Sequence, residues 1–358
     1  MLVSPGPRIA DTSPRSSRPQ ASAPPTVGAS IFVDSFESSE SHGHYVEGAA
    51  ASLGPTGPTV RQNQRQMIDG QVTMPHARAT TRLQLALSAQ PLSPDQAAET
   101  LQQFVRDSAA GNLDLASNLL GQIEATGYRN SVVNLSQGID ALVLLQLSKA
   151  ALGPKSRLSS EAQQTYRTNL GAALNLAPGS DEKSTDQATL ELIKGTLKGD
   201  PEVQKSVEGW RDSVRSFESG HNSVVVAAGN SGTAIKGLAR AGFSVDGSED
   251  LNLLAVPEVT TVGATAVDNQ GRLVFSGSSS FGPEVDVLAN GDHQGRFGTS
   301  YAAPKVANAL RAVHLANPDF SSDEAERYLS SRLSDPATIA GQPVAILDDR
   351  KATILLAQ

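Results

Sequence analysis

The sequence predicts an α/β fold, and three observations support this prediction. Short runs rich in β-branched residues occur at residues 30–33, 131–135 and 223–228, each followed by small or polar residues. Segments with helical spacing of apolar residues separate these runs, so helix and strand alternate along the chain. The composition, with 39% hydrophobic residues and 31 Gly, is that of a folded protein. The chain of 358 residues has room for two average domains or for one large α/β domain with insertions.

The composition also excludes several classes of protein. Because the chain has no Cys, disulfide scaffolds, thiolate metal sites and cysteine nucleophiles are excluded. A net charge of −8 argues against a nucleic acid as partner. The most apolar stretch, residues 139–147, contains Asp140 and Gln146 and is far shorter than the roughly 18 residues of a membrane span. We therefore expect neither a nucleic acid nor a membrane as a partner.

The first 29 residues are predicted to form a disordered tail. They hold six Pro and five Ser and are too poor in large apolar side chains to build a core. Pro5 and Pro7 stand where a secretory signal needs a continuous apolar segment, so we expect a cytoplasmic location or export without a cleaved signal peptide. The tail resembles the unstructured export signals of injected bacterial effectors, although an ordinary disordered terminus explains the same composition.

The folded part is predicted to begin with a short strand at residues 30–33, which leads into Asp34. A helix of small residues follows at residues 42–51, and residues 53–76, rich in Gly, Pro and Gln, are predicted to form an exposed loop. Residues 93–95 (Ser-Pro-Asp) open a helix, and another helix is expected up to about Gly127.

The second half begins with a buried strand at residues 131–135. Residues 139–219 are almost wholly helical in pattern and are predicted to be an insertion. Further strands are expected at residues 223–228, 259–267, 273–275 and 285–287, and further helices from Ser300 through Val313 and from Ser322 to about Leu333.

Residues 298–304 read Gly-Thr-Ser-Tyr-Ala-Ala-Pro and place Ser300 at the start of a helix rich in Ala. A Ser hydroxyl at a helix N-terminus lies beside free backbone N–H groups, which can stabilise the oxyanion formed when that hydroxyl attacks a carbonyl. The same pattern also suits a simple N-cap Ser on a buried helix.

Four segments together resemble the subtilisin-like serine peptidases. Residues 298–304 resemble the nucleophile motif of that family, residues 225–230 (Val-Val-Ala-Ala-Gly-Asn) its oxyanion strand, and residues 133–138 (Val-Asn-Leu-Ser-Gln-Gly) its substrate-pairing strand. Residues 42–48 (His-Gly-His-Tyr-Val-Glu-Gly) are similar to the start of its His helix, with three positions replaced. The likeness runs with gaps from residue 31 to about residue 313, and the order Asp, His, Asn, Ser is that of the family.

The resemblance implies a subtilisin-like fold with a mostly parallel central sheet flanked by helices, carrying the helical insertion at 139–219. It divides the chain into the tail (1–29), a catalytic domain (30–320) and a C-terminal helix with its extension (321–358). It also implies a serine endopeptidase that acts on a protein or peptide through an acyl-enzyme, with no cofactor and no metal. The implied roles are Ser300 as nucleophile, His42 as general base and acid, Asp34 as the carboxylate orienting His42, Asn230 as oxyanion donor, and Ser136 and Gly138 as backbone partners of an extended substrate.

Two of these assignments have alternatives within the sequence. Asp34 stands only eight residues before His42, a shorter separation than the family uses. Asp11, in Ala-Asp-Thr-Ser, has a spacing closer to that of the family but lies in the tail. We assign Asp34, because an apolar strand precedes it and can hold its carboxylate rigidly. His44 is an alternative to His42 as the base.

Two other functions fit the same motifs. The replaced positions in the His motif are compatible with a catalytically degenerate protein that keeps the groove as a binding module. A non-proteolytic serine hydrolase, such as an esterase, would use the same nucleophile.

Overall fold

A computed structural model describes residues 26–358 except 37, 39, 64, 65, 69, 70, 137 and 250. The predicted tail and Asp11 therefore lie outside the described residues up to residue 25. Within the described part, a central sheet of nine strands has the order β12-β13-β9-β7-β6-β5-β1-β2, with β8 paired to β7. Its strands are β1 (Ser30–Asp34), β2 (Thr59–Asn63), β5 (Val132–Leu135), β6 (Ser223–Ala227), β7 (Thr260–Val267), β8 (Leu273–Phe275), β9 (Val287–Asn290), β12 (Ser334–Ile339) and β13 (Gln342–Leu347).

Most neighbouring strands of this sheet run parallel, and only the pairs β7–β8 and β12–β13 are antiparallel. Two short antiparallel pairs lie apart from it, β3 (Gln66–Ile68) with β4 (Gln71–Thr73) and β10 (Asp292–His293) with β11 (Arg296–Phe297). The predicted α/β fold with a mostly parallel sheet is confirmed.

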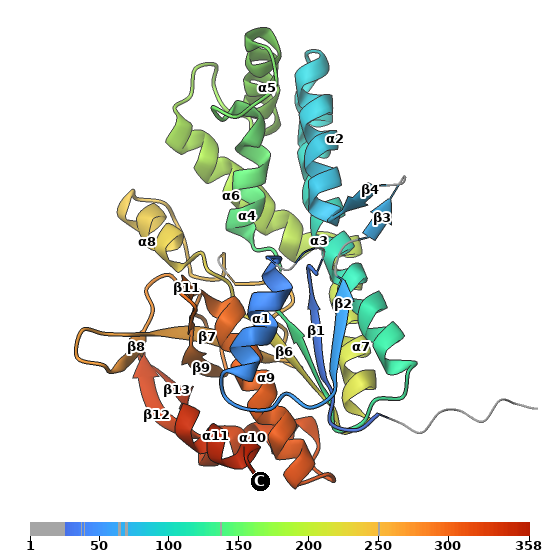
Figure 1. The fold of residues 1–358 in the computed structure, drawn as a ribbon. Helices are drawn as coiled ribbons and strands as arrows, with labels where there is room; N and C mark the ends of the chain where they lie inside the picture. The colour runs from blue at the N-terminus through green and yellow to red at the C-terminus, as the bar shows by residue number, and fades with distance from the viewer. Residues whose placement is uncertain are drawn as a thin grey trace, which may run out of the picture.

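Helices cover both faces of the sheet (Figure 1). They are α1 (His42–Ala51), α2 (Pro75–Ala89), α3 (Pro94–Glu124), α4 (Ala141–Lys149), α5 (Ser160–Ala173), α6 (Glu182–Gly199), α7 (Pro201–Glu218), α8 (Gly232–Arg240), α9 (Thr299–Ala316), α10 (Ser322–Arg332) and α11 (Asp349–Leu356), with a 3-10 turn at Ala150–Leu152.

The central strands read as continuous apolar runs because both of their faces are buried. Since alternate side chains of a strand point to opposite faces, Val224 and Val226 of β6 pack with Trp210 and Phe217 of α7. Val225, between them, packs on the other face among residues of α9. Helix α9 is thus enclosed between the sheet and its neighbouring helices, which holds its N-terminus in place.

The helices within residues 139–219 belong to two different parts of the molecule. Helices α4, α5 and α6 share a hydrophobic core with α2 and the first half of α3, built from residues such as Phe104, Leu142, Tyr166 and Leu190. We call this unit the helical bundle; it projects away from the sheet in Figure 1. Helix α7 instead covers the sheet through Trp210 and its neighbours.

Three sequence predictions differ from the structure. Residues 59–63 form the edge strand β2, although a loop was expected over 53–76. The two helices expected between Ser93 and Gly127 are the single helix α3. Gly111 lies in the middle of α3 without breaking it. A β-carbon at this position would approach Pro75 to 2.8 Å, so the missing side chain allows α2 and α3 to pack closely. The C-terminal residues add the hairpin β12–β13 to the sheet.

An acidic cluster lies where α7 and α10 meet the sheet. Burial, with a smaller contribution from the nearby Glu326, raises the pKa of Glu218 to about 8, although the hydroxyl of Ser322 donates a hydrogen bond of 2.8 Å to its carboxylate and acts in the opposite direction. Burial likewise raises the pKa of Glu326 to about 7. In the folded protein these carboxyl groups therefore hold protons that the unfolded chain releases.

The contribution of Glu218 and Glu326 to the stability of the protein is expected to fall as the pH rises from about 5 to 8. A carboxyl group with a raised pKa stabilises the fold fully below its unfolded pKa of about 4.3, and that contribution is lost as the pH approaches its folded pKa. Glu218→Gln, which keeps an acceptor for Ser322, should therefore raise the Tm relative to the parent at pH 8 but not at pH 5. Thermal unfolding at both pH values measures this, with the exposed Glu161→Gln as control. An equal Tm difference at the two pH values would contradict the prediction.

Candidate active site

Asp34 is the last residue of β1, and its side chain is fully buried. The backbone N–H of Ser35 donates a hydrogen bond of 2.7 Å to its Oδ1. Because β1 lies between β2 and β5, the carboxylate is attached to a rigid part of the sheet. It faces the start of the following helix.

His42 is the first residue of α1 and lies against Asp34. Its Nδ1 is 3.0 Å from Oδ1 and 2.9 Å from Oδ2 of that carboxylate. An ionised carboxylate can only accept, so Nδ1 carries the hydrogen, and Nε2 of the neutral ring is the nitrogen able to accept a proton. The ring lies 5.7 Å from the ring of Tyr301, which follows Ser300.

The short connection between Asp34 and His42 depends on Gly43. Its N–H donates to the carbonyl oxygen of Ser35 at 3.0 Å. A β-carbon at this position would lie 2.7 Å from that oxygen and 2.6 Å from the ring of Phe36. Only Gly lets α1 start this close to the end of β1, so eight residues suffice to join the two side chains.

Ser300 lies in the first turn of α9, and two hydrogen bonds join it to Ser136, one from its side chain and one to its backbone. The hydroxyl of Ser300 donates to the carbonyl oxygen of Ser136 at 2.9 Å, and the hydroxyl of Ser136 donates to the carbonyl oxygen of Ser300 at 3.1 Å. The side chain of Asn134 in turn donates to the Ser136 hydroxyl at 2.7 Å. The end of β5 is thus joined to the start of α9.

Asn230 follows β6 and is oriented by α9. Its Oδ1 accepts hydrogen bonds from the N–H of Thr299 at 2.9 Å and from the Thr299 hydroxyl at 3.3 Å. Since the amide oxygen is held in this way, the Nδ2 group points elsewhere and can donate to another molecule. The side chain is exposed.

If Asn230 is the oxyanion donor that the sequence predicts, its removal should lower kcat by about 10²–10³-fold with little change in KM, because such a donor acts on charge that develops only in the transition state. Asn230→Asp is the informative variant, since it keeps an acceptor for Thr299 but has no N–H to donate. Kinetics on a peptide substrate, with folding checked by circular dichroism, measure the effect. A folded Asn230→Asp protein with the kcat of the parent would exclude this role.

Gly138 lies beyond β5, next to Asn252. A β-carbon at Gly138 would lie only 2.0 Å from Oδ1 of Asn252, so a side chain is not accommodated there. Gly138 itself is exposed, whereas Ser136 is buried.

His44, the alternative base, has its ring packed edge-on against Phe36 with centroids 5.4 Å apart. Away from the predicted site, a 2.8 Å hydrogen bond joins the hydroxyl of Ser223 to Nε2 of His314. Both residues are fully buried, and burial lowers the pKa of His314 to about 4. Since no substrate reaches this pair, we interpret it as a structural contact.

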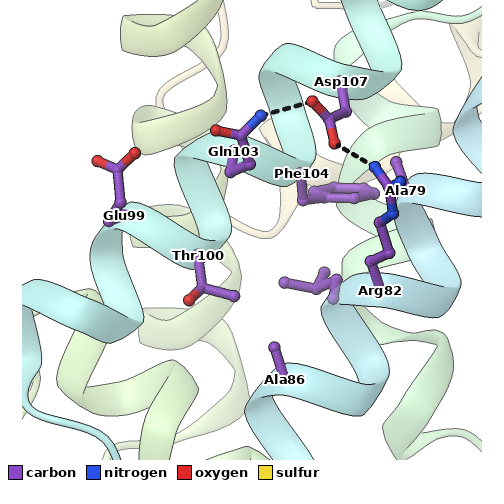
Figure 2. A pocket seen from close by; sticks show the side chains of 9 residues that line it. Ala79, Arg82, Ala86, Glu99, Thr100, Gln103, Phe104 and Asp107 are labelled. Carbon is purple, nitrogen blue, oxygen red and sulfur yellow. Dashed lines mark hydrogen bonds and ion pairs between the residues drawn. The ribbon is translucent and has the colours of Figure 1, made fainter.

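Among the described residues, side chains of the helical bundle line a hollow. It has a volume of about 450 Å³ and lies between α2 and α3 (Figure 2). Its polar side chains pair with one another, as Asp107 accepts from Gln103 at 2.5 Å and from Arg82 at 3.3 Å. These pairs leave little chemistry for a substrate, and none of the predicted site residues lines this hollow.

Two further findings concern metals and membranes. Among the described residues, no group of three or more His, Asp or Glu side chains could hold a metal ion. Within the same part of the chain, no helix combines the length and the apolar character needed to cross a membrane.

The chain was compared with protein families, curated proteins and solved structures. The sequence matches the subtilase family over residues 34–337. A cold-adapted subtilisin-like serine proteinase is 14% identical, with 90% of this chain and 88% of that chain covered and a TM-score of 0.41. The A-subunit of the AB5 toxin from E. coli is also 14% identical, with 93% of each chain covered and a TM-score of 0.45. No curated protein sequence matches this chain significantly.

The family match begins at Asp34, the last residue of β1, and covers α1, the bundle and all of α9. It confirms the subtilisin-like α/β fold, with its mostly parallel sheet flanked by helices, that the motifs predicted. The chain therefore belongs to the subtilase family of serine-type peptidases.

Proposed function

We propose that this protein is a serine endopeptidase that hydrolyses peptide bonds through an acyl-enzyme. The observation that carries the proposal is the contact of His42 Nδ1 with the buried carboxylate of Asp34, at 2.9–3.0 Å. This contact sets the tautomer in which Nε2 can take a proton. The ring also lies beside Tyr301, at the N-terminal end of the helix that carries Ser300.

The proposed reaction begins with the hydroxyl of Ser300. In this structure it donates to the carbonyl oxygen of Ser136, so it must first turn toward His42 Nε2. Its Oγ then attacks the carbonyl carbon of the substrate while the proton passes to His42. The new oxyanion accepts hydrogen bonds from Nδ2 of Asn230 and from backbone N–H groups in the first turn of α9.

The second half of the reaction reverses the roles. His42 gives its proton to the leaving amine, the C–N bond breaks, and the acyl group remains on Ser300. A water molecule, deprotonated by His42, then attacks the ester and releases the new carboxyl end. The carboxylate of Asp34 stabilises the imidazolium at both stages without taking the proton.

The substrate is proposed to bind as an extended strand beside the segment that follows β5. Backbone groups around Ser136 and Gly138 would pair with it, as in the addition of a strand to a sheet. The exposed backbone at Gly138 supports this placement.

A fluorophosphonate probe tests the proposal, because it reacts only with an activated Ser. The parent protein should be labelled, and Ser300→Ala should not. Ser276→Ala serves as a matched control, since it removes another largely buried hydroxyl and should leave labelling unchanged. An unlabelled parent protein would contradict the proposal.

Labelling by the fluorophosphonate probe also bears on two alternative functions. A binding module without catalysis is favoured by one observation, the donation of the Ser300 hydroxyl to Ser136 instead of to a base, and it predicts no labelling. A non-proteolytic serine hydrolase predicts labelling. A digest of a peptide library then distinguishes it from a peptidase, which cleaves the peptides.

A further inference from the structure

We infer that the helical bundle holds the substrate groove in shape through Lys194 and Glu249, which act as positioning residues for peptide binding. The inference rests on the proposed peptidase function. Lys194 lies on α6 of the bundle, whereas Glu249 belongs to the loop that precedes Asn252.

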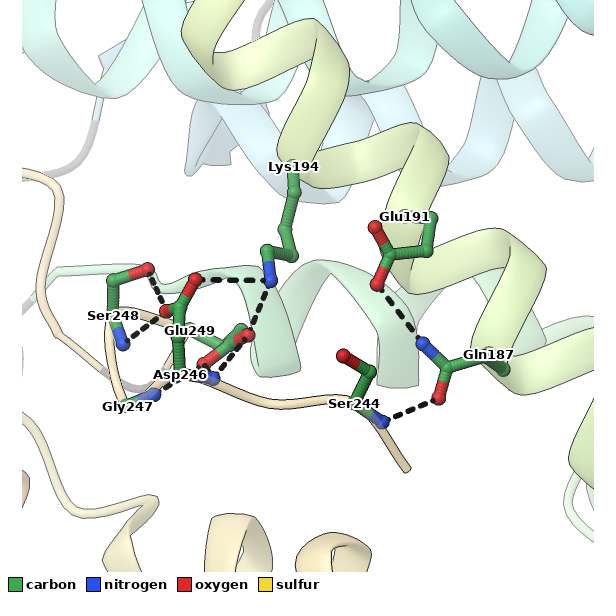
Figure 3. A network of polar contacts seen from close by, with 8 residues as sticks. All are labelled: Gln187, Glu191, Lys194, Ser244, Asp246, Gly247, Ser248 and Glu249. Carbon is green, nitrogen blue, oxygen red and sulfur yellow. Dashed lines mark hydrogen bonds and ion pairs between the residues drawn. The ribbon is translucent and has the colours of Figure 1, made fainter. Parts of the chain in front are cut away.

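The side chain of Glu249 is fully buried, and Lys194 is its charged partner. The Nζ of Lys194 donates to Oε1 of Glu249 at 2.6 Å and to Oδ2 of Asp246 at 3.3 Å (Figure 3). The N–H of Gly247 donates to Oε2 of Glu249 at 2.8 Å. The backbone oxygen of Glu249 accepts from the N–H of Leu142, at the start of α4. Glu249 thus joins two helices of the bundle to this loop, α6 through its carboxylate and α4 through its backbone carbonyl oxygen.

A few residues further along the chain, Asn252 connects the ends of two strands. Its N–H donates to the carbonyl oxygen of Ala228, and its Nδ2 donates to that of Ala227, both at 2.9 Å. The neighbouring Leu253 donates its N–H to the carbonyl oxygen of Ile139 at 2.9 Å. The side chain of Asn252 also occupies the space beside Gly138.

Asn252 therefore supports both the segment proposed to pair with the substrate, around Gly138, and the strand end that leads to Asn230. If the loop at Glu249 moves, these two segments lose a common support. A shift of about 1 Å in substrate position can lower a rate by about 10²-fold. Removal of Lys194 leaves the carboxylate of Glu249 buried without its cation, which destabilises this arrangement.

The proposed nucleophile and the two side chains proposed to activate it are attached elsewhere, and only Asn230 among the proposed chemical groups shares the support of Asn252. Asp34, His42 and Ser300 lie on β1, α1 and α9. The hydrogen bonds and ion pairs of Lys194 join α6 to the loop at Asp246 and Glu249, and they involve none of these three elements. Loss of Lys194 should therefore impair the binding of an extended peptide more than the reactivity of Ser300.

The test compares Lys194→Met with Lys149→Met. Lys149 pairs with Glu182 and Asp186 at 2.8 and 2.7 Å, so the control removes an ion pair of the same bundle that does not involve the loop. We expect Lys194→Met to raise KM for an extended peptide by about tenfold or more, and to lower kcat and the rate of fluorophosphonate labelling by a smaller factor, because Asn230 alone among the groups proposed for the chemistry shares the support of Asn252. Lys194→Arg, which keeps the positive charge, should have a KM close to that of the parent protein.

Hydrogen–deuterium exchange gives a second readout that needs no catalysis. Backbone amides of residues 139–142 and 251–254 should exchange faster in Lys194→Met than in Lys149→Met. Equal KM and equal exchange in the two variants would overturn the inference while leaving the proposed function intact. A parent protein that is neither labelled nor cleaves peptides would instead refute the proposed function, and the substrate role of Lys194 with it.

Discussion

Replacement of His42 by Ala is expected to lower kcat about 10⁶-fold, since loss of the base in a subtilisin-type site costs nearly as much as loss of the whole set of catalytic side chains. Without an imidazole, the hydroxyl of Ser300 remains protonated and is a poor nucleophile. Turnover of a chromogenic peptide, measured with an excess of enzyme, detects the residual rate.

His44→Ala is the matched control for this prediction. The ring of His44 packs against Phe36, whereas the Nδ1 of His42 contacts the carboxylate of Asp34. The His44→Ala protein should keep a kcat close to that of the parent. If His44→Ala lost as much activity as His42→Ala and the folded His42→Ala protein remained active, the base would be His44.

Replacement of Asp34 by Asn should lower kcat about 10⁴-fold. The amide can donate to Nδ1, which favours the tautomer with the hydrogen on Nε2, and that nitrogen then cannot accept the proton of Ser300. Since Asn and Asp have nearly the same size, the fold should persist, as circular dichroism would show.

A truncation of residues 1–25 tests whether Asp34 or Asp11 orients His42, because it removes Asp11, which lies outside the described residues, and keeps Asp34. The truncated protein should keep its activity if Asp34 orients His42. Loss of activity in the truncated protein, together with a normal kcat in Asp34→Asn, would assign the role to Asp11.

The local sequence was sufficient to predict the central strands and the motifs of the site. Residues 30–33, 131–135 and 223–228 are apolar without alternation because both faces of a parallel sheet are buried, and this signal is visible in a single strand. The Gly-Thr-Ser motif at the start of α9 is equally local. The roles of Asp34, His42, Asn230 and Ser300 stay predictions until the variants are measured.

The edges of the sheet were not predictable from the sequence in the same way. Strand β2 (Thr-Val-Arg-Gln-Asn) alternates between exposed and half-buried positions and has little apolar character. It is a strand because its backbone pairs with β1 over five residues. The hairpin β12–β13 contains Pro336 and Pro343, which disfavour a strand locally, but the pairing of β13 with β9 places it at the edge of the sheet.

The sequence by itself determined the α/β class, the family and the residue types available for chemistry. Only the tertiary structure decided which of them meet. Helix α7 looks like part of an insertion in the sequence, yet Trp210 packs on the sheet. Lys194 and Glu249 are 55 residues apart and become partners only when α6 lies against the loop before Asn252. The physical reason is that periodicity and motifs report the immediate surroundings of a residue, whereas contacts between distant segments depend on how the completed elements pack.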